Sequence, residues 1–214
     1  YDNMPEKLSE VHLNAIPLDS SHLNRRFRAS LRSLGIQETQ GLTLSNERDQ
    51  FERIRWPAQG GLSVISNPIT IDHTLMRQYI LPSLLRLLAA NRHHELPQRV
   101  YELGEVVRDS ANSTRVAWAC AEVGGGFTAA KGIAQALLRD LGADMGEVVF
   151  EATEEAQGPW IAGRGARVLI SGEEVGQFGE IDPAVSYEFG LRSPLHAGEF
   201  DIEASGRLIP RPVL

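Results

Sequence analysis

Two pairs of acidic residues lie within otherwise apolar stretches of the sequence, and they are the first candidates for chemistry. They are Glu102 with Glu105, and Glu180 with Asp182. Because residues i and i+2 of a strand share a face, Glu180 and Asp182 can lie side by side. Two carboxylates that close raise the pKa of one of them, as a general acid and base require. A solvated or arginine-paired strand end explains the same spacing, and the spacing alone does not decide between them.

Three other chemically capable residues have simpler interpretations. His93 and His94 are adjacent, so their side chains diverge and cannot share a metal as an i, i+4 pair does. They fall where a helix should end, and a polar helix terminus explains them. Cys120 lies in an apolar strand pattern with no His near it in sequence, which favours a small buried hydrophobe over a nucleophile.

The glycine-rich segment 124–132 superficially resembles a phosphate-binding loop. Such a loop needs a Lys directly after Gly and before Ser or Thr. Here Lys131 precedes Gly132 and no hydroxyl residue follows. We therefore interpret the segment as a flexible connection from a strand to a helix.

Hydrophobic periodicity predicts the elements that must position these residues. Pro82 interrupts one long helical pattern, so we divide it into a short helix ending near Ile80 and a main helix from Pro82. The predicted helices cover residues 21–34, 74–80, 82–91, 128–141 and 183–189. The predicted strands cover residues 36–45, 62–65, 98–108, 115–123, 147–152, 166–171, 175–181 and 195–202. Hairpin-joined strands with unevenly placed helices indicate an α+β fold with a mainly antiparallel sheet flanked by helices.

The turns and irregular segments complete this scheme. We expect a polar turn over 109–114, a glycine-first turn at Gly172-Glu173, a loop over 46–59 and a tail after residue 202. Residues 1–18 contain two Pro and no sustained periodicity, so we expect an arm or linker there and one domain over 19–214.

Composition excludes several classes of protein. The 214 residues carry a net charge of −7, one Cys and no signal-like opening, which indicates a cytosolic globular protein without disulfides or a cysteine-bound zinc. No apolar run approaches the roughly 20 residues that cross a bilayer. Only two of the 21 Lys+Arg residues are Lys, and the acidic balance argues against a general nucleic-acid binder. A local cationic patch on the first helix stays open, formed by Arg25, Arg26, Arg28 and Arg32.

Three stretches in a fixed order carry a family resemblance. The first includes Asn67-Pro68-Ile69, Leu81-Pro82-Ser83 and Asn91-Arg92; the second is Arg99-Val100-Tyr101-Glu102-Leu103-Gly104-Glu105; the third includes Gly163-Arg164-Gly165 and Gly179-Glu180-Ile181-Asp182-Pro183. Together they resemble the C-terminal, synthetase-like module of the phenylalanyl-tRNA synthetase β subunit, of the archaeal and eukaryotic-cytosolic type. The resemblance runs from Tyr1 to about Ile202. The opening Tyr1-Asp2-Asn3-Met4-Pro5 is similar to the phrase that leaves the preceding module, so the chain is expected to be a fragment.

The resemblance implies a class II synthetase-like fold. Helix 21–34 and the strand after it look like motif 1, and the helix from Pro82 with the strand ending at Arg108 looks like motif 2. A catalytic relative adds a motif 3 arginine in Gly-x-Gly-x-x-Arg, but no such phrase follows Glu180, and at Gly163-Arg164-Gly165 the next Arg167 comes one residue early. Without that second cation the phosphate chemistry loses its main electrostatic support. Arg108 is then expected to be a motif 2 relic or an ion-pair partner.

The function that the resemblance implies is structural. The module would be catalytically inactive and would support the catalytic α subunit in an (αβ)₂ phenylalanine–tRNA ligase of the cytoplasm. ATP, Mg²⁺ and tRNA(Phe) would belong to the holoenzyme, with no cofactor, metal ligand or membrane contact in this chain. Subunit-interface candidates share one face of the first helix, with burial against the chain's own sheet as the alternative: Leu23, Phe27, Leu31 and Leu34. Other readings are a stand-alone ATP-dependent class II ligase and a tRNA-binding module.

Overall fold

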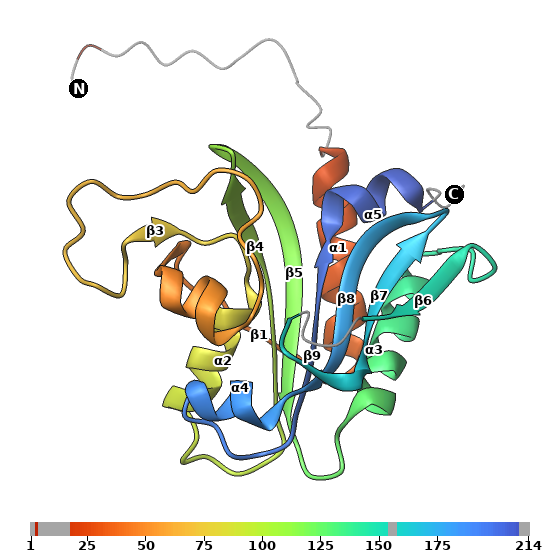
Figure 1. Cartoon of the computed structure of the whole chain (residues 1–214). Helices are drawn as coiled ribbons and strands as arrows, with labels where there is room; N and C mark the ends of the chain where they lie inside the picture. The colour runs from red at the N-terminus through yellow and green to blue at the C-terminus, as the bar shows by residue number, and fades with distance from the viewer. Residues whose placement is uncertain (1–2, 4–17, 154–157, 210–214) are drawn as a thin grey trace.

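The computed structural model describes Asn3 and residues 18–153 and 158–209 (Figure 1). Its helices are α1 (Asp19–Ser33), α2 (Leu81–Ala90), α3 (Phe127–Asp140), α4 (Pro183–Glu188) and α5 (Ile202–Leu208), with a π-helical segment η1 (Arg48–Arg53). Its strands are β1 (Gln37–Glu38), β2 (Leu44–Ser45), β3 (Leu75–Met76), β4 (Gln98–Arg108), β5 (Ala111–Ala121), β6 (Val148–Ala152), β7 (Trp160–Ile170), β8 (Glu173–Ile181) and β9 (Leu195–Asp201).

One large sheet organises the fold. Its strand order is β1-β4-β5-β9-β8-β7-β6, and every pairing is antiparallel except that of β1 with β4. Strands β2 and β3 form a separate antiparallel pair. Figure 1 shows α1, α3 and α5 on one face of the sheet and α2 and α4 on the other. The predicted α+β architecture with a mainly antiparallel sheet is therefore confirmed.

Each face of the sheet has its own apolar core, because alternate residues of a strand point to opposite faces. On β5, Trp118 and Cys120 join the core under α1 and α3, whereas Ala117 and Ala119 join the core under α2. The first core also buries Phe27 and Leu31 of α1 and Leu137 and Leu138 of α3. The second buries Leu81, Leu84, Leu85 and Leu88 of α2 together with Trp56 and Trp160.

The β4–β5 hairpin turns more tightly than the sequence predicted, and the β7–β8 turn is shifted by one residue. Asp109 and Ser110 alone join β4 to β5, and both have positive φ, 51° and 60°. Ser171 and Gly172 join β7 to β8 with φ of 50° and 84°. Positive φ at both central residues is the geometry that matches the twist of paired strands. The predicted turn at 109–114 was thus too long, and the glycine-first turn was placed one residue late.

Most predicted elements are present, and the largest errors lie between residues 36 and 80. The predicted strand 36–45 is two separate two-residue strands, β1 and β2, and the predicted strand 62–65 is a single bridge from Val64 to Leu75. The predicted loop 46–59 contains η1. The short helix predicted over 74–80 is wrong, because residues 75–76 form β3 and the chain then runs irregularly to α2.

The expected tail after residue 202 is also partly wrong, because α5 begins there. Asp201 accepts a hydrogen bond from the Ala204 amide at 2.8 Å and thereby caps the helix. The predicted arm over residues 1–18 lies outside the described residues, apart from Asn3 and Leu18.

Candidate functional site

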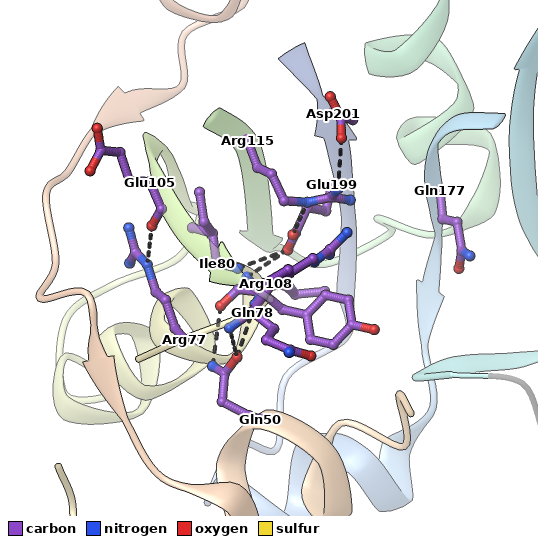
Figure 2. Close-up of polar contacts among 12 residues, drawn as sticks. Gln50, Arg77, Gln78, Ile80, Glu105, Arg108, Arg115, Gln177, Glu199 and Asp201 are labelled. Atoms are coloured by element: carbon purple, nitrogen blue, oxygen red, sulfur yellow. Dashed lines mark hydrogen bonds and ion pairs between the residues drawn. The ribbon is translucent and has the colours of Figure 1, made fainter. Parts of the chain in front are cut away.

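A buried carboxylate joins helix α2 to the sheet. Glu199 on β9 is 1 % exposed, and its Oε2 accepts the amides of Ile80 at 3.0 Å and Leu81 at 2.9 Å (Figure 2). These amides belong to the first turn of α2, which has no capping side chain of its own. Helix N-terminal amides lack intrahelical partners and favour a negative charge. Glu199 therefore supplies from another strand the cap that the local sequence lacks.

Arg115 of β5 completes this carboxylate cluster. Its Nε donates to Glu199 Oε1 at 2.7 Å, and its Nη1 lies 3.4 Å from Asp201 Oδ2. The Arg115 side chain is only 12 % exposed, so little water competes with the pair. The Nε and Nη1 atoms of Arg115 thus both donate to carboxylates of the same chain.

Arg108, the predicted motif 2 arginine, lies at the end of β4 beside this cluster. Its Nη2 donates to the Gln78 carbonyl at 3.0 Å, and its guanidinium lies 5.2 Å from the ring centroid of Tyr79. Burial, and next the positive charge of Arg115, lower the pKa of Arg108 below its ordinary value. Burial also raises the pKa of Tyr79 to about 12, so both groups keep one protonation state near neutral pH.

The segment between β3 and α2 is held by side chains from distant elements. Gln50 of η1 is fully buried; its Oε1 accepts the amides of Gln78 and Tyr79, each at 2.9 Å, and its Nε2 donates to the Tyr79 carbonyl at 3.1 Å. Tyr79 Oη donates to the Pro57 carbonyl at 2.6 Å. These bonds take up the backbone groups that a helix over 74–80 would have used.

A buried ion pair anchors the same segment to β4. Arg77 Nη2 lies 2.6 Å from Glu102 Oε1, with side-chain exposures of 1 % and 2 %, and Arg77 Nε donates to the Glu105 carbonyl at 3.0 Å. Gly104 lets the guanidinium lie against β4, because a Cβ there would be 2.5 Å from Arg77 Nη2. The carboxylate of Glu105 instead accepts a bond from Asn112 at 3.1 Å. Glu102 and Glu105 therefore have separate partners.

The second predicted carboxylate pair is divided in the same way. Glu180 pairs with Arg164 at 2.8 Å, whereas Asp182 pairs with Arg55 at 2.9 Å and caps α4 through the Ala184 amide. Arg-paired strand ends are the simpler of the two interpretations, and the geometry supports it. Glu180 and Asp182 thus bind different arginines and do not form an acid–base pair with each other.

The remaining residues from the sequence analysis have structural surroundings. Cys120 is fully buried, and burial raises the pKa of its thiol to about 12. The imidazoles of His93 and His94 lie just beyond the end of α2 with ring centroids 4.2 Å apart and a tilt of 38°, so the prediction that these side chains diverge is wrong. Residues 122–126 connect β5 to α3, so the predicted strand-to-helix connection is confirmed for 124–126, whereas 127–132 belong to α3. Arg167, at the near miss to motif 3, lies on β7 and pairs with Glu151 and Glu174.

The four apolar residues of α1 face their own sheet. Phe27 and Leu31 are fully buried in the core, and Leu23 and Leu34 are partly buried against it. Phe27 and Leu31 therefore have no surface left for another subunit, and an interface role stays a prediction only for Leu23 and Leu34. The arginines on the other faces of α1 each have a partner within the chain. Arg25, Arg26 and Arg32 donate to the carbonyls of Ser21, Leu141 and Arg28, respectively, and Arg28 donates to the carboxylate of Glu38.

A cavity of about 350 Å³ opens next to the cluster. Tyr79, Arg115, Gln177 and Trp56 line part of it. The ring centroid of Trp56 lies 4.7 Å from that of Tyr79 and 6.0 Å from that of Trp160, so these three aromatic rings pack against one another. Within the described ranges, no set of three His, Cys, Asp or Glu side chains is placed to hold a metal ion, and no helix is long and apolar enough to span a bilayer.

The sequence analysis missed the residues that hold this cluster together, namely Glu199, Arg77 and Gln50. Glu199 and Arg77 are polar residues within or beside apolar runs, as Glu199 is between Gly198 and Phe200, whereas Gln50 lies in a polar stretch that carries no such signal. A lone polar residue in a buried strand must find a partner, and that was the available signal.

The polar cluster joins helix α2 to a mainly antiparallel sheet within an α+β domain. The sequence matches the family model described as the phenylalanyl tRNA synthetase beta chain CLM domain over residues 4–202. The chain therefore belongs to this family, and the resemblance to the β subunit is confirmed.

Individual relatives agree with this assignment. The chain is 40 % identical to the phenylalanine–tRNA ligase beta subunit of Methanopyrus kandleri over 83 % of this chain and 30 % of the relative. The identity is 32 % to that of Methanothrix thermoacetophila, over 94 % of this chain and 36 % of the relative. The chain is 34 % identical to the beta subunit of Pyrococcus horikoshii, over 77 % of this chain and 30 % of the relative. The chain thus spans about a third of the length of the curated relatives it matches.

Proposed function

We propose that this chain is a non-catalytic, class II synthetase-like module of a phenylalanine–tRNA ligase β subunit, and that it supports assembly with the catalytic α subunit. The observation that carries the proposal is the engagement of the two arginines above the sheet. Arg115 is bound by Glu199 and Asp201, and Arg108 faces a carbonyl and the Tyr79 ring. Activation of an amino acid by ATP needs cations that face the transferred groups. Here those cations fix α2 on the sheet.

The proposed (αβ)₂ holoenzyme attaches phenylalanine to tRNA(Phe) in the cytoplasm with ATP and Mg²⁺. In this proposal the α subunit supplies the catalytic residues, and the present chain supplies a surface that binds the α subunit. Its C-terminal place within the β subunit is part of the same proposal and rests on the sequence resemblance. Its relation to class II synthetases is proposed as well, supported by the mainly antiparallel sheet and by the position of Arg108 at the end of β4.

An exposed apolar surface on the segment 41–76 is the proposed contact with the α subunit. Of the ten large apolar side chains that are exposed among the described residues, five lie on this segment: Leu42, Leu62, Val64, Ile69 and Ile71. Ile69 is 99 % and Ile71 is 88 % exposed. Scattered exposed apolar residues are ordinary, but a concentration on one segment favours a protein interface. Figure 1 shows the loop that precedes β3 extending away from the sheet.

Co-expression of the chain with a tagged α subunit tests the assembly role. We expect the two to co-purify, and failure of a folded chain to do so would overturn the role. ATP–pyrophosphate exchange tests the inactive state separately. We expect none from the chain alone, whereas exchange by the chain alone would favour a stand-alone ATP-dependent ligase.

A further inference from the structure

A second cavity, of about 620 Å³, lies beyond the ends of α2 and α4 on the side of the molecule opposite the β4–β5 turn. It lies between the loop that follows α2 and the loop that joins α4 to β9 (Figure 1). Its lining includes Arg92, His93, His94 and Arg192 over an apolar base of Leu88 and Leu191. No Asp or Glu of the described chain lines it. In a protein with a net charge of −7, this is a local cationic hollow.

The two arginines of this cavity lack partners within the described residues. Most of the described arginines make an ion pair or donate to a backbone carbonyl. Four make neither: Arg48, Arg92, Arg139 and Arg192. Two of these four, Arg92 and Arg192, line the same cavity. Glu95 and Glu188 are near in sequence, yet neither pairs with them.

Helix capping does not explain these cations. Arginine near a helix C-terminus commonly serves the terminal carbonyls. Here backbone amides already serve them: those of Asn91 and Arg92 donate to the end of α2, and those of Phe189, Gly190 and Leu191 donate to the end of α4. The guanidinium of Arg92 points instead toward the turn at Gly190, where a Cβ would lie 3.7 Å from Nη1.

We propose that this cavity binds a phosphate group, with Arg92 and Arg192 as its principal ligands and His93 and His94 beside them. A guanidinium presents a planar fork of donors that matches phosphate oxygens, and two guanidinium groups compensate the negative charge of a phosphate group. The phosphate belongs either to a small phosphorylated compound or to an RNA backbone. The inference goes beyond the α-subunit assembly and does not depend on it.

The test compares two double variants of the chain that remove the same charge. Arg92→Gln with Arg192→Gln alters the cavity, and Arg48→Gln with Arg139→Gln removes two unpartnered arginines elsewhere. All four side chains are exposed, so we expect both variants to fold, and thermal unfolding checks this. The probes are inorganic pyrophosphate by calorimetry and unfractionated tRNA by filter binding at several salt concentrations.

We expect the cavity variant to weaken pyrophosphate binding at least about tenfold, because two charged hydrogen-bond donors are lost, and the control to stay within about twofold. If the phosphate is that of RNA, the cavity variant also lowers the slope of log affinity against log salt by roughly 1 to 2. Pyrophosphate binding without tRNA binding assigns the cavity to a small phosphorylated compound. Absence of binding to both probes, or equal loss in the two variants, overturns the proposal.

Discussion

Glu199 and Arg115 lie diagonally across β9 and β5, where Arg115 has Asp201 as its direct cross-strand neighbour. The Oε1–Nε distance is 2.7 Å, and the other oxygen of Glu199 receives the amides of Ile80 and Leu81. One carboxylate therefore compensates both a buried cation and the start of a helix. That double role explains how the cluster positions α2 on the sheet.

Glu199→Gln tests this role with almost no change in volume. In this variant Asp201 is the carboxylate that remains for Arg115, and one carboxylate oxygen of residue 199 becomes an NH₂ group that cannot accept a hydrogen bond. We therefore expect the free energy of unfolding to fall by about 2–4 kcal/mol. The exposed Glu188→Gln is the control, with a change within about 0.5 kcal/mol. Urea unfolding measures both. A loss below about 1 kcal/mol for Glu199→Gln would show that the cap is dispensable.

The buried Arg77–Glu102 pair gives a second prediction. Arg77→Met and Glu102→Gln each leave one buried charge or donor set without its partner, and each should cost about 3–5 kcal/mol. The double variant should cost less than the sum by at least about 1 kcal/mol, because the residues are in direct contact. A double-mutant cycle in urea measures the coupling, and simple additivity would contradict the pairing.

Two glycines should respond to Ala in opposite directions. Gly198 on β9 lies directly under the Trp118 ring, where a Cβ would clash, so Gly198→Ala should destabilise by about 1–3 kcal/mol. Gly132 lies within α3 with open space around it, so Gly132→Ala should stabilise by roughly 0.5–1 kcal/mol. Thermal unfolding of both variants checks the signs, and the same sign for both would refute the packing argument.

Glu122 gives a prediction about pH. Burial raises its pKa, but hydrogen bonds from His196 and Arg99 outweigh burial, so its pKa lies below the ordinary 4.5. Cys120, the other titratable group near it, stays protonated in this range. A carboxyl group with a lowered pKa in the folded state stabilises that state above its unfolded pKa, and the contribution disappears as the pH falls through the folded value.

We therefore expect Glu122→Gln to be less stable than the wild type at pH 7, with the difference shrinking below about pH 4.5. Unfolding by urea at a series of pH values measures it. A difference that grows on acidification would contradict the hydrogen bonds that Glu122 accepts from His196 and Arg99.

The sequence predicted the elements with strong periodicity and short-range signals. Strand β4 was placed at its observed bounds, and Pro82 correctly marked the first turn of α2, because Pro favours that position. The prediction for the segment before α2 failed because Gln50 binds its backbone and Glu102 binds Arg77, both across 25 or more residues of sequence. Such tertiary contacts override local propensity and leave no periodic pattern.

The candidate site was predictable only in part. Arg108 was identified from the family resemblance, and the structure adds its actual neighbours, Gln78 and Tyr79. The helix face containing Phe27 and Leu31 was ambiguous, because an apolar stripe looks the same whether it packs on its own sheet or on a partner. Burial decides this for Phe27 and Leu31 and directs the search for an interface to the segment 41–76.

The affinity of the chain for the α subunit tests the central claim most directly. We predict that Ile69→Asp with Ile71→Asp weakens binding at least about tenfold, because buried apolar surface would have to accept two charges. Val123→Asp with Val149→Asp is the matched control, since these residues are 85 % and 56 % exposed on other parts of the surface, and it should bind as the wild type does. Equal affinity of all three folded proteins would contradict the proposed interface, and no binding by any of them would contradict the assembly role.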